Sequence, residues 1–139
     1  MFNIIRPLIF KFSPEVAHSL AIKALKLNNI SYSKPIDNHI LETTFCEKKL
    51  SSPIGVAAGF DKNAEVYNPL FNLGFGFVEV GTITPKPQFG NPKPRVFRLE
   101  EDEALINRLG FNNSGSEQIS QTIKAVSYTH LRAHETLSH

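Results

Sequence analysis

Three polar side chains in the middle of the chain have types and positions that suit ligand binding. Lys62 follows the apolar run 54–59, Thr82 closes a second apolar run, and Asn107 lies in a third alternating segment. A lysine charge can hold a carboxylate, a threonine hydroxyl can donate or accept a hydrogen bond, and an asparagine amide offers one acceptor and two donors. The ordinary alternative for Lys62 is a solvated ion pair with the neighbouring Asp61, as for most exposed lysines.

Two small residues, Ala58 and Gly59, end the first apolar run. Small residues at a strand end let the backbone approach a flat ring system closely. Tight packing of a strand against a helix needs the same residue types, and the residues alone favour this simpler explanation. Both explanations stay open at this point.

A strand, a helix and a second strand are predicted around these residues. Residues 54–59 and 76–82 are the small, apolar runs expected of strands buried on both faces. Between them, apolar residues from Val66 to Phe71 recur at helical spacing, and Gly74 marks the helix end. Such a unit has a right-handed parallel crossover and places its binding groups on the loops after the strands. The residues alone therefore indicate an α/β sheet or barrel that binds a flavin or a phosphate-bearing ligand.

Two short amphipathic helices are predicted before this unit. The first covers residues 2–12, and the second runs from Pro14 to about Leu27 behind an N-cap at Ser13. The N-terminal apolar run is interrupted by charges and is shorter than the ~20 residues of a spanning helix, so we expect it not to cross a bilayer. Residues 28–38 are polar and turn-rich, which predicts a linker and a domain boundary near residue 38.

A first hairpin is predicted after the linker. Residues 41–45 alternate as a strand, and residues 47–49 suit a turn into Leu50. Cys46 is then expected to be a packed strand residue. As the single cysteine it cannot form an internal disulfide or a zinc motif, which fits a reducing cytoplasmic setting.

A long loop, a second hairpin and a final helix are predicted beyond the unit. Four prolines make residues 84–94 a stiff loop, and residues 95–99 and 104–110 alternate as two strands of a lid-like hairpin. Ser114 and Glu117 suit a capping box for the helix that follows.

Composition sets broad limits. A hydrophobic content of 41% suffices for a core, and 15 basic against 13 acidic residues give no support to nucleic-acid binding. His130, His134 and His139 near the C-terminus lack a fixed third ligand at metal-site spacing, so we expect no metal site.

Three sequence blocks closely resemble the class 2 dihydroorotate dehydrogenases, which are quinone-dependent and membrane-associated. The blocks are AAGFDKN at 57–63, GFGFVEVGTITPKPQFGNPKPRVFRL at 74–99 and INRLGFNN at 106–113, preceded by SPEVAH at 13–18. Their order and spacing extend the resemblance over roughly residues 1–126. It implies the N-terminal part of a (β/α)8 TIM barrel, truncated and preceded by a two-helix membrane-associating extension.

The resemblance also implies a function. The family oxidises dihydroorotate to orotate in pyrimidine synthesis, with FMN as cofactor and a membrane quinone as electron acceptor. The chain is then expected to bind anionic lipid from the cytoplasmic side of the cell membrane, as a peripheral protein. Basic residues of the helix pair support this placement: Arg6, Lys11, Lys23 and Lys26 against one acid, Glu15.

The site residues are carried over from the family position by position. The resemblance assigns FMN binding to Ala58, Gly59, Phe60, Asp61, Lys62 and Thr82, and substrate binding to Lys62, Asn107, Arg108, Leu109, Gly110 and Phe111. It places His18 and Arg98 along the quinone tunnel. Asn112 and Asn113 are interpreted as turn and cap residues.

The chain departs from the family after residue 126. The resemblance places the family's serine base and further FMN ligands beyond that point, and residues 127–139 have no family counterpart, so we expect them to be a non-native tail and the fragment to be inactive. The division is then 1–38 for the extension and linker, 39–126 for the first part of the barrel, and 127–139 for the tail. Two alternatives remain, another FMN-dependent TIM-barrel oxidoreductase and a non-enzymatic membrane-binding helical module.

Overall fold

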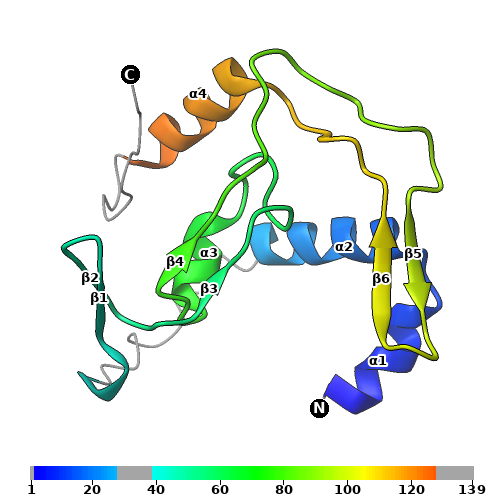
Figure 1. Ribbon diagram of the computed structural model, residues 1–139, viewed down its shortest axis with the longest axis horizontal. Helices are drawn as coiled ribbons and strands as arrows, with labels where there is room; N and C mark the ends of the chain where they lie inside the picture. Colours follow the sequence, from blue (N-terminus) through cyan, green and yellow to red (C-terminus); the bar gives the residue numbers. More distant parts are fainter. Residues whose placement is uncertain (1, 28–38, 128–139) are drawn as a thin grey trace.

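The computed structural model of the chain describes residues 2–27 and 39–127. The linker predicted at 28–38 and the three C-terminal histidines lie outside the described residues. Helices and strands are mixed, as predicted for an α/β chain: α1 Phe2–Phe10, α2 Pro14–Leu27, a 3-10 turn His39–Leu41, β1 Thr43–Phe45, β2 Lys48–Leu50, β3 Gly55–Val56, α3 Tyr67–Asn72, β4 Phe77–Val78, β5 Val96–Leu99, β6 Ala104–Asn107 and α4 Ser116–Ser127. Figure 1 shows the strand pairs β1–β2, β3–β4 and β5–β6 as three separate two-stranded sheets.

The two N-terminal helices confirm the sequence prediction. Helix α2 begins at Pro14, and the Ser13 carbonyl accepts the first helical hydrogen bond, from the Ala17 N–H at 2.9 Å. Helix α1 ends at Phe10, two residues earlier than predicted. In the part of the chain that the structure describes, every helix is too short or too polar to span a membrane.

The predicted strand–helix–strand unit is present, with β3 and β4 parallel. Their register pairs Gly55 with Phe77 and Val56 with Val78. Pro69 is the third residue of α3, so it lies in the first turn, where a proline removes no helical hydrogen bond. Gly74 has a φ of +97° just after the helix, the conformation expected of a glycine that ends one.

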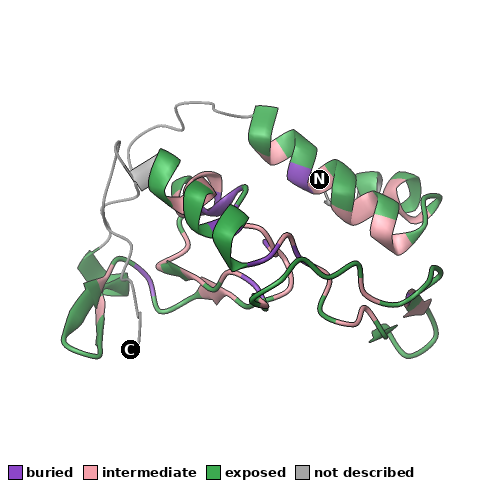
Figure 2. Cartoon of the chain, turned by 90° about the horizontal axis from the view of Figure 1, so that it is seen from above, coloured by how far each residue is buried: buried purple, intermediate pink, exposed green. Residues whose placement is uncertain are grey.

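The core consists of two small clusters around this unit. Ile22 of α2 packs on Val66 and Leu70, and Ile119 of α4 packs on Ala64 and Tyr67. Exposed residues cover most of the rest of the chain, including both faces of the β1–β2 hairpin (Figure 2). Helix α2, which precedes the strand–helix–strand unit, and helix α4, which follows it, therefore both contribute to the core of the unit.

The expectation that residues 54–59 are buried on both faces is wrong for this chain. Ile54 is 65% exposed, and Ala57 and Ala58 are exposed. The physical reason is that β3 pairs with β4 alone among the described strands, so one strand edge and part of each face have no neighbour.

Two local predictions need correction. Cys46 and Glu47 form the β1–β2 turn with φ values of 47° and 63°, so Cys46 is an exposed turn residue and not a packed strand residue. Two successive left-handed residues suit a tight hairpin turn, which therefore begins one residue earlier than the predicted 47–49.

The capping box predicted at Ser114 is also wrong, because α4 begins at Ser116. The Gly115 carbonyl accepts the helical hydrogen bond from Ile119 at 3.1 Å, which makes Gly115 the N-cap.

Candidate functional site

The loops that follow β3 and β4 are joined by main-chain hydrogen bonds. The Gly59 N–H donates to the Gly81 carbonyl at 2.7 Å, and the Gly81 N–H donates to the Asp61 carbonyl at 3.1 Å. Lys62 and Thr82 therefore lie on adjoining loops at the carboxyl ends of two parallel strands, as the sequence predicted.

Open space lies over the end of β3. A side-chain carbon built on Gly59 would meet no atom within 4 Å. Ala58 and Thr82 beside it are exposed. This surface can therefore accept a flat ligand against the backbone, and it is not the tightly packed strand–helix contact that the residues alone favoured.

Both oxygens of the Asp61 carboxylate form hydrogen bonds within the protein. Asp61 is 1% exposed, and its two oxygens accept hydrogen bonds from the backbone N–H groups of Glu65 at 2.7 Å and Val66 at 2.8 Å. These N–H groups precede α3, so a negative charge here is favourable. Asp61 thus fixes the shape of the loop that carries Lys62, and its side chain faces the protein.

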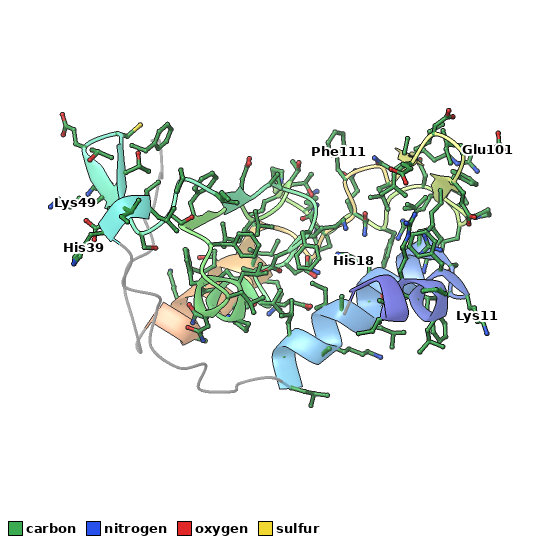
Figure 3. The ribbon with its side chains drawn as sticks, turned by 90° about the horizontal axis from the view of Figure 1, so that it is seen from below. Lys11, His18, His39, Lys49, Glu101 and Phe111 are labelled. Atoms are coloured by element: carbon green, nitrogen blue, oxygen red, sulfur yellow. The ribbon has the colours of Figure 1, made fainter. Side chains whose placement is uncertain are left out.

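His18 joins helix α2 to the same loop. Its Nε2 lies 2.7 Å from the Phe60 carbonyl oxygen, and its ring meets the Phe60 ring edge-on with centroids 5.4 Å apart. Figure 3 shows His18 between α2 and the central loops. The extension is therefore held directly on the predicted cofactor loop.

Lys62 is half-buried in this loop, and its surroundings shift its ionisation. Burial is the largest cause and lowers the pKa of Lys62, the Glu15 carboxylate raises it, and the Arg95 guanidinium lowers it. A partly desolvated ammonium group binds an anion more strongly than a fully hydrated one, because the local dielectric constant is lower. Lys62 therefore suits an anionic ligand.

The stretch 107–111 continues from β6 along the surface. Asn107 is exposed, and Phe111 is 64% exposed with a φ of 52°. The Arg108 guanidinium donates a hydrogen bond to the Pro94 carbonyl at 3.1 Å and lies 5.8 Å from the centroid of the Phe97 ring. Gly110 also has a positive φ, of 72°. The two left-handed residues turn the chain. Asn107 Oδ1 accepts a long hydrogen bond from the Leu109 N–H at 3.5 Å, and the exposed Asn107 side chain and Phe111 ring can be reached by a ligand.

Asn113 organises the turn that follows, which confirms its interpretation as a turn residue. Its Nδ2 donates to the Phe111 carbonyl at 2.7 Å and to Thr84 Oγ1 at 2.9 Å, and its Oδ1 accepts from the Gly115 N–H at 2.8 Å. Asn63 contributes a further bond, because its Oδ1 accepts from the Ser114 N–H at 2.9 Å. Sequence reasoning assigned no role to Asn63, although it follows Lys62 directly.

Arg98 makes its contacts with the end of helix α1 and with the turn that follows it. Its Nη1 donates to the Phe12 carbonyl at 2.8 Å and the Phe10 carbonyl at 3.3 Å, and its guanidinium lies 4.5 Å from the Phe10 ring centroid. A cation at the last carbonyls of a helix is stabilising. His18 and Arg98 thus fasten the extension at two different places, one on the β3 loop and one on β5.

Sequence reasoning missed the ion pair of Glu15 with Arg95. Arg95 Nη2 lies 2.6 Å from Glu15 Oε1, and Arg95 is only 7% exposed. The hydrogen bond from Arg95 holds the pKa of the Glu15 carboxyl below its usual range. Glu15 was interpreted as a helix-dipole residue, and the sequence contains no signal that would join two residues 80 positions apart.

A cavity with a volume of about 920 Å³ lies elsewhere. Residues of the loop 85–89 and of the start of α4 line it, together with Asn63, and it includes none of Lys62, Thr82 and Asn107. In the described part of the chain, no group of three potential metal-ligating side chains occurs.

Comparison with known proteins decides the family. The family model described as dihydroorotate dehydrogenase matches residues 40–135. The chain belongs to the dihydroorotate dehydrogenase family. The resemblance stated from the sequence blocks is confirmed, and with it membership of an α/β TIM-barrel family.

Individual relatives agree with the family match. The chain is 54% identical over 114 residues to a dihydroorotate dehydrogenase (quinone) of Rhodospirillum rubrum, covering 82% of this chain and 31% of the relative. It is 57% identical over 112 residues to the protein of the same name from Bartonella henselae, covering 81% and 31%. A solved structure of DHODH from Eimeria tenella in complex with ferulenol has a TM-score of 0.77 and 44% identity, covering 88% of this chain and 34% of that one. The chain thus spans about a third of the length of these relatives.

Proposed function

We propose that this chain is the N-terminal part of a quinone-dependent dihydroorotate dehydrogenase. In this proposal it supplies the two-helix extension and the opening strands of the TIM barrel, and the remaining strands lie in the part of the relatives that it does not span. The observation that carries the proposal is the junction of the β3 and β4 loops, where half-buried Lys62 lies beside the open backbone of Gly59. The division into residues 1–38, 39–126 and 127–139 belongs to the same proposal; the family match at residues 40–135 runs past the proposed boundary at 126.

FMN is the proposed cofactor, and the residues fit it. The open space over Gly59 and the exposed Ala58 allow a flat ring to lie on the backbone, and the Thr82 hydroxyl is exposed beside them. Phe60 and Asp61 contribute by fixing the loop. When bound, FMN accepts the hydride that leaves the substrate.

The proposed substrate is dihydroorotate, with orotate as product. Lys62 would hold the substrate carboxylate with its positive charge, and the Asn107 amide would pair with the amide edge of the pyrimidine ring. Phe111 would form an apolar wall, and Arg108, Leu109 and Gly110 would contribute as the backbone of this stretch. The base that removes the substrate proton is proposed to be a serine outside residues 1–126, so this chain alone lacks it.

The quinone side of the proposal concerns the extension. We place α1 and α2 on the cytoplasmic face of the cell membrane, with quinone passing His18 and Arg98 on its way to the flavin. Several large apolar side chains of these helices and of the turn between them support a lipid contact because they are exposed: Ile5, Leu8, Phe12, Val16 and Leu20.

Substitutions in the full-length enzyme test this function. Lys62→Ala should slow flavin reduction by dihydroorotate by roughly 100-fold or more, since it removes a fixed charge from the site. Asn107→Ala should raise the dihydroorotate Kd by about tenfold through a lost hydrogen bond, with FMN retained. Anaerobic stopped-flow absorbance of the flavin measures both quantities.

The alternatives make different predictions in the same experiment. Another FMN-dependent oxidoreductase would bind flavin, and a substrate screen would find its reductant while dihydroorotate left the flavin oxidised. A membrane-binding module would carry no flavin, and its liposome binding would survive deletion of residues 39–126. Either result would contradict the proposed function.

A further inference from the structure

The ion pair between Glu15 and Arg95 is sheltered and joins the extension to the barrel side. Glu15 lies in the first turn of α2, and Arg95 lies immediately before β5. Besides the 2.6 Å contact of Nη2 with Oε1, Arg95 Nε donates to both carboxylate oxygens at 3.2 and 3.3 Å. Lys93 Nζ adds a more exposed contact with Oε1 at 3.4 Å. Two-pronged bonding to a buried guanidinium fixes its orientation as well as its position.

The same guanidinium holds the proline-rich loop. Arg95 Nη1 donates to the Phe89 carbonyl at 2.6 Å and to the Asn91 carbonyl at 3.1 Å. Gly90 lies between these two residues, and a side-chain carbon there would collide with the Leu109 carbonyl and approach Arg95 Nη1. The loop is therefore packed directly between Arg95 and the stretch 107–111.

Three consecutive carbonyls of that stretch are bound by the loop. Asn91 Nδ2 donates to the Arg108 carbonyl at 2.7 Å, and the Asn91 N–H donates to the Leu109 carbonyl at 3.0 Å. Gln88 Nε2 donates to the Gly110 carbonyl at 2.9 Å. An unbroken series of hydrogen bonds thus leads from α2 through Arg95 and residues 88–91 to residues 108–110.

We propose that Glu15 and Arg95 are positioning residues for the substrate side of the site, so that the N-terminal extension sets the affinity for dihydroorotate through the loop 88–91. This inference rests on the proposed function and deepens it. The Glu15 charge fixes Arg95, Arg95 fixes the carbonyls of Phe89 and Asn91, and Asn91 with Gln88 fixes the backbone that presents Asn107 and Phe111. Without the carboxylate charge, a buried guanidinium lacks its counter-ion and must move toward water, and the loop moves with it.

The test uses the full-length, FMN-loaded enzyme and the substitution Glu15→Gln. The expected result is a dihydroorotate Kd raised roughly tenfold, with the limiting rate of flavin reduction, the FMN content and the quinone KM unchanged. Glu65→Gln is the matched control, because Glu65 also pairs with α2, through Lys26 Nζ at 3.0 Å, but lies outside the loop. It should leave the dihydroorotate Kd at the wild-type value.

Asn91→Ala provides a second measurement that leaves the ion pair intact and serves if Glu15→Gln does not fold. It should raise the dihydroorotate Kd by a similar factor, and the double variant should be no worse than the more damaging single variant, because both act through one series of bonds. A Glu15→Gln enzyme that changes only the quinone KM, or an Asn91→Ala enzyme with wild-type affinity, would overturn the inference. If the wild-type flavin is not reduced by dihydroorotate at all, the proposed function fails instead.

Discussion

The surroundings of Lys62 shift its pKa in opposite directions. Burial lowers its pKa, and the two partners of the ion pair act in opposite directions, since Glu15 raises the pKa and Arg95 lowers it. As long as the pair is intact, these two effects oppose each other at Lys62. Only the protonated form of Lys62 attracts a carboxylate, so the affinity for an anionic substrate should hold below its pKa and be lost above it.

A pH titration of orotate binding follows from this argument. Because the pKa of Lys62 is lowered, the affinity should begin to fall at a pH below the ordinary lysine range. Glu15→Gln removes the carboxylate that raises the pKa of Lys62, so the fall should move to lower pH still. The change in flavin absorbance when orotate binds gives the affinity, and measuring it across the alkaline pH range shows where the affinity falls.

The ionisation of the ligand itself cancels in this comparison, because every variant is titrated with the same compound. Glu65→Gln should titrate like the wild type. If the affinity for orotate falls at the same pH in Glu15→Gln and in the wild type, the pKa of Lys62 does not depend on Glu15.

Single residues also show the limits of prediction from sequence. The positions of Lys62 and Thr82 on adjoining loops followed from the rule that parallel strands end at the same edge, and the hydrogen bonds between Gly59 and Gly81 confirm it. The local use of the Asp61 carboxylate could not be foreseen, because it depends on how the chain turns back toward α3. The ion pair of Glu15 and Arg95 is a tertiary contact that leaves no spacing pattern.

At the scale of elements, prediction succeeded where local chemistry decides. Helix α2 begins and ends at the predicted residues because a serine, a proline and an acid define its start and apolar spacing defines its length. The β1–β2 turn was misplaced because Cys46 and Glu47 adopt left-handed conformations without a glycine or asparagine to signal them. The start of α4 was misplaced because Asn113 and Asn63 shape the preceding turn through contacts with distant loops.

The helix pair α1–α2 should bind anionic membranes reversibly. Lys26 is already paired with Glu65, so the salt-sensitive attraction should come mainly from Arg6, Lys11 and Lys23. Each basic side chain near an anionic surface contributes about 1 kcal/mol, so Lys11→Gln with Lys23→Gln should weaken vesicle binding by on the order of ten- to thirtyfold at low salt. Sedimentation of the full-length enzyme with phosphatidylserine vesicles measures this.

Lys49→Gln is the control for that experiment, because Lys49 lies on the β1–β2 hairpin at the far end of the molecule from Lys11 (Figure 3). It should bind vesicles like the wild type. Equal binding at low and high salt, or an equal loss in the Lys49 variant, would contradict an electrostatic role of the helices.

At the scale of the whole molecule, the described strands are not joined into one sheet. The match to the Eimeria tenella structure covers 34% of that chain, and the described strands here form three separate two-stranded sheets. The sequence predicted the parallel pair, which the structure contains. That the barrel is incomplete in this chain stays a prediction, made because 139 residues fall well short of the ~250 that an eight-stranded barrel needs. Ile54 and Phe77, at the β3–β4 pair, are exposed, and no further described strand lies beside this pair.

The isolated 139-residue chain should therefore be neither cooperatively folded nor active. Only six hydrophobic residues are buried in the described part of the chain, and Phe89, Phe45 and Ile54 are among many that are exposed. So small a core cannot offset the conformational entropy of ordering the chain, and the open edges of β3 and β4 invite association.

Scanning calorimetry should show no sharp unfolding transition, flavin absorbance should be lost on gel filtration, and dihydroorotate should reduce no dye. The full-length enzyme is the positive control in all three measurements. A soluble monomeric chain that unfolds cooperatively, retains FMN and turns over dihydroorotate would show instead that residues 1–139 hold a complete site, and would refute the proposal that its base lies elsewhere.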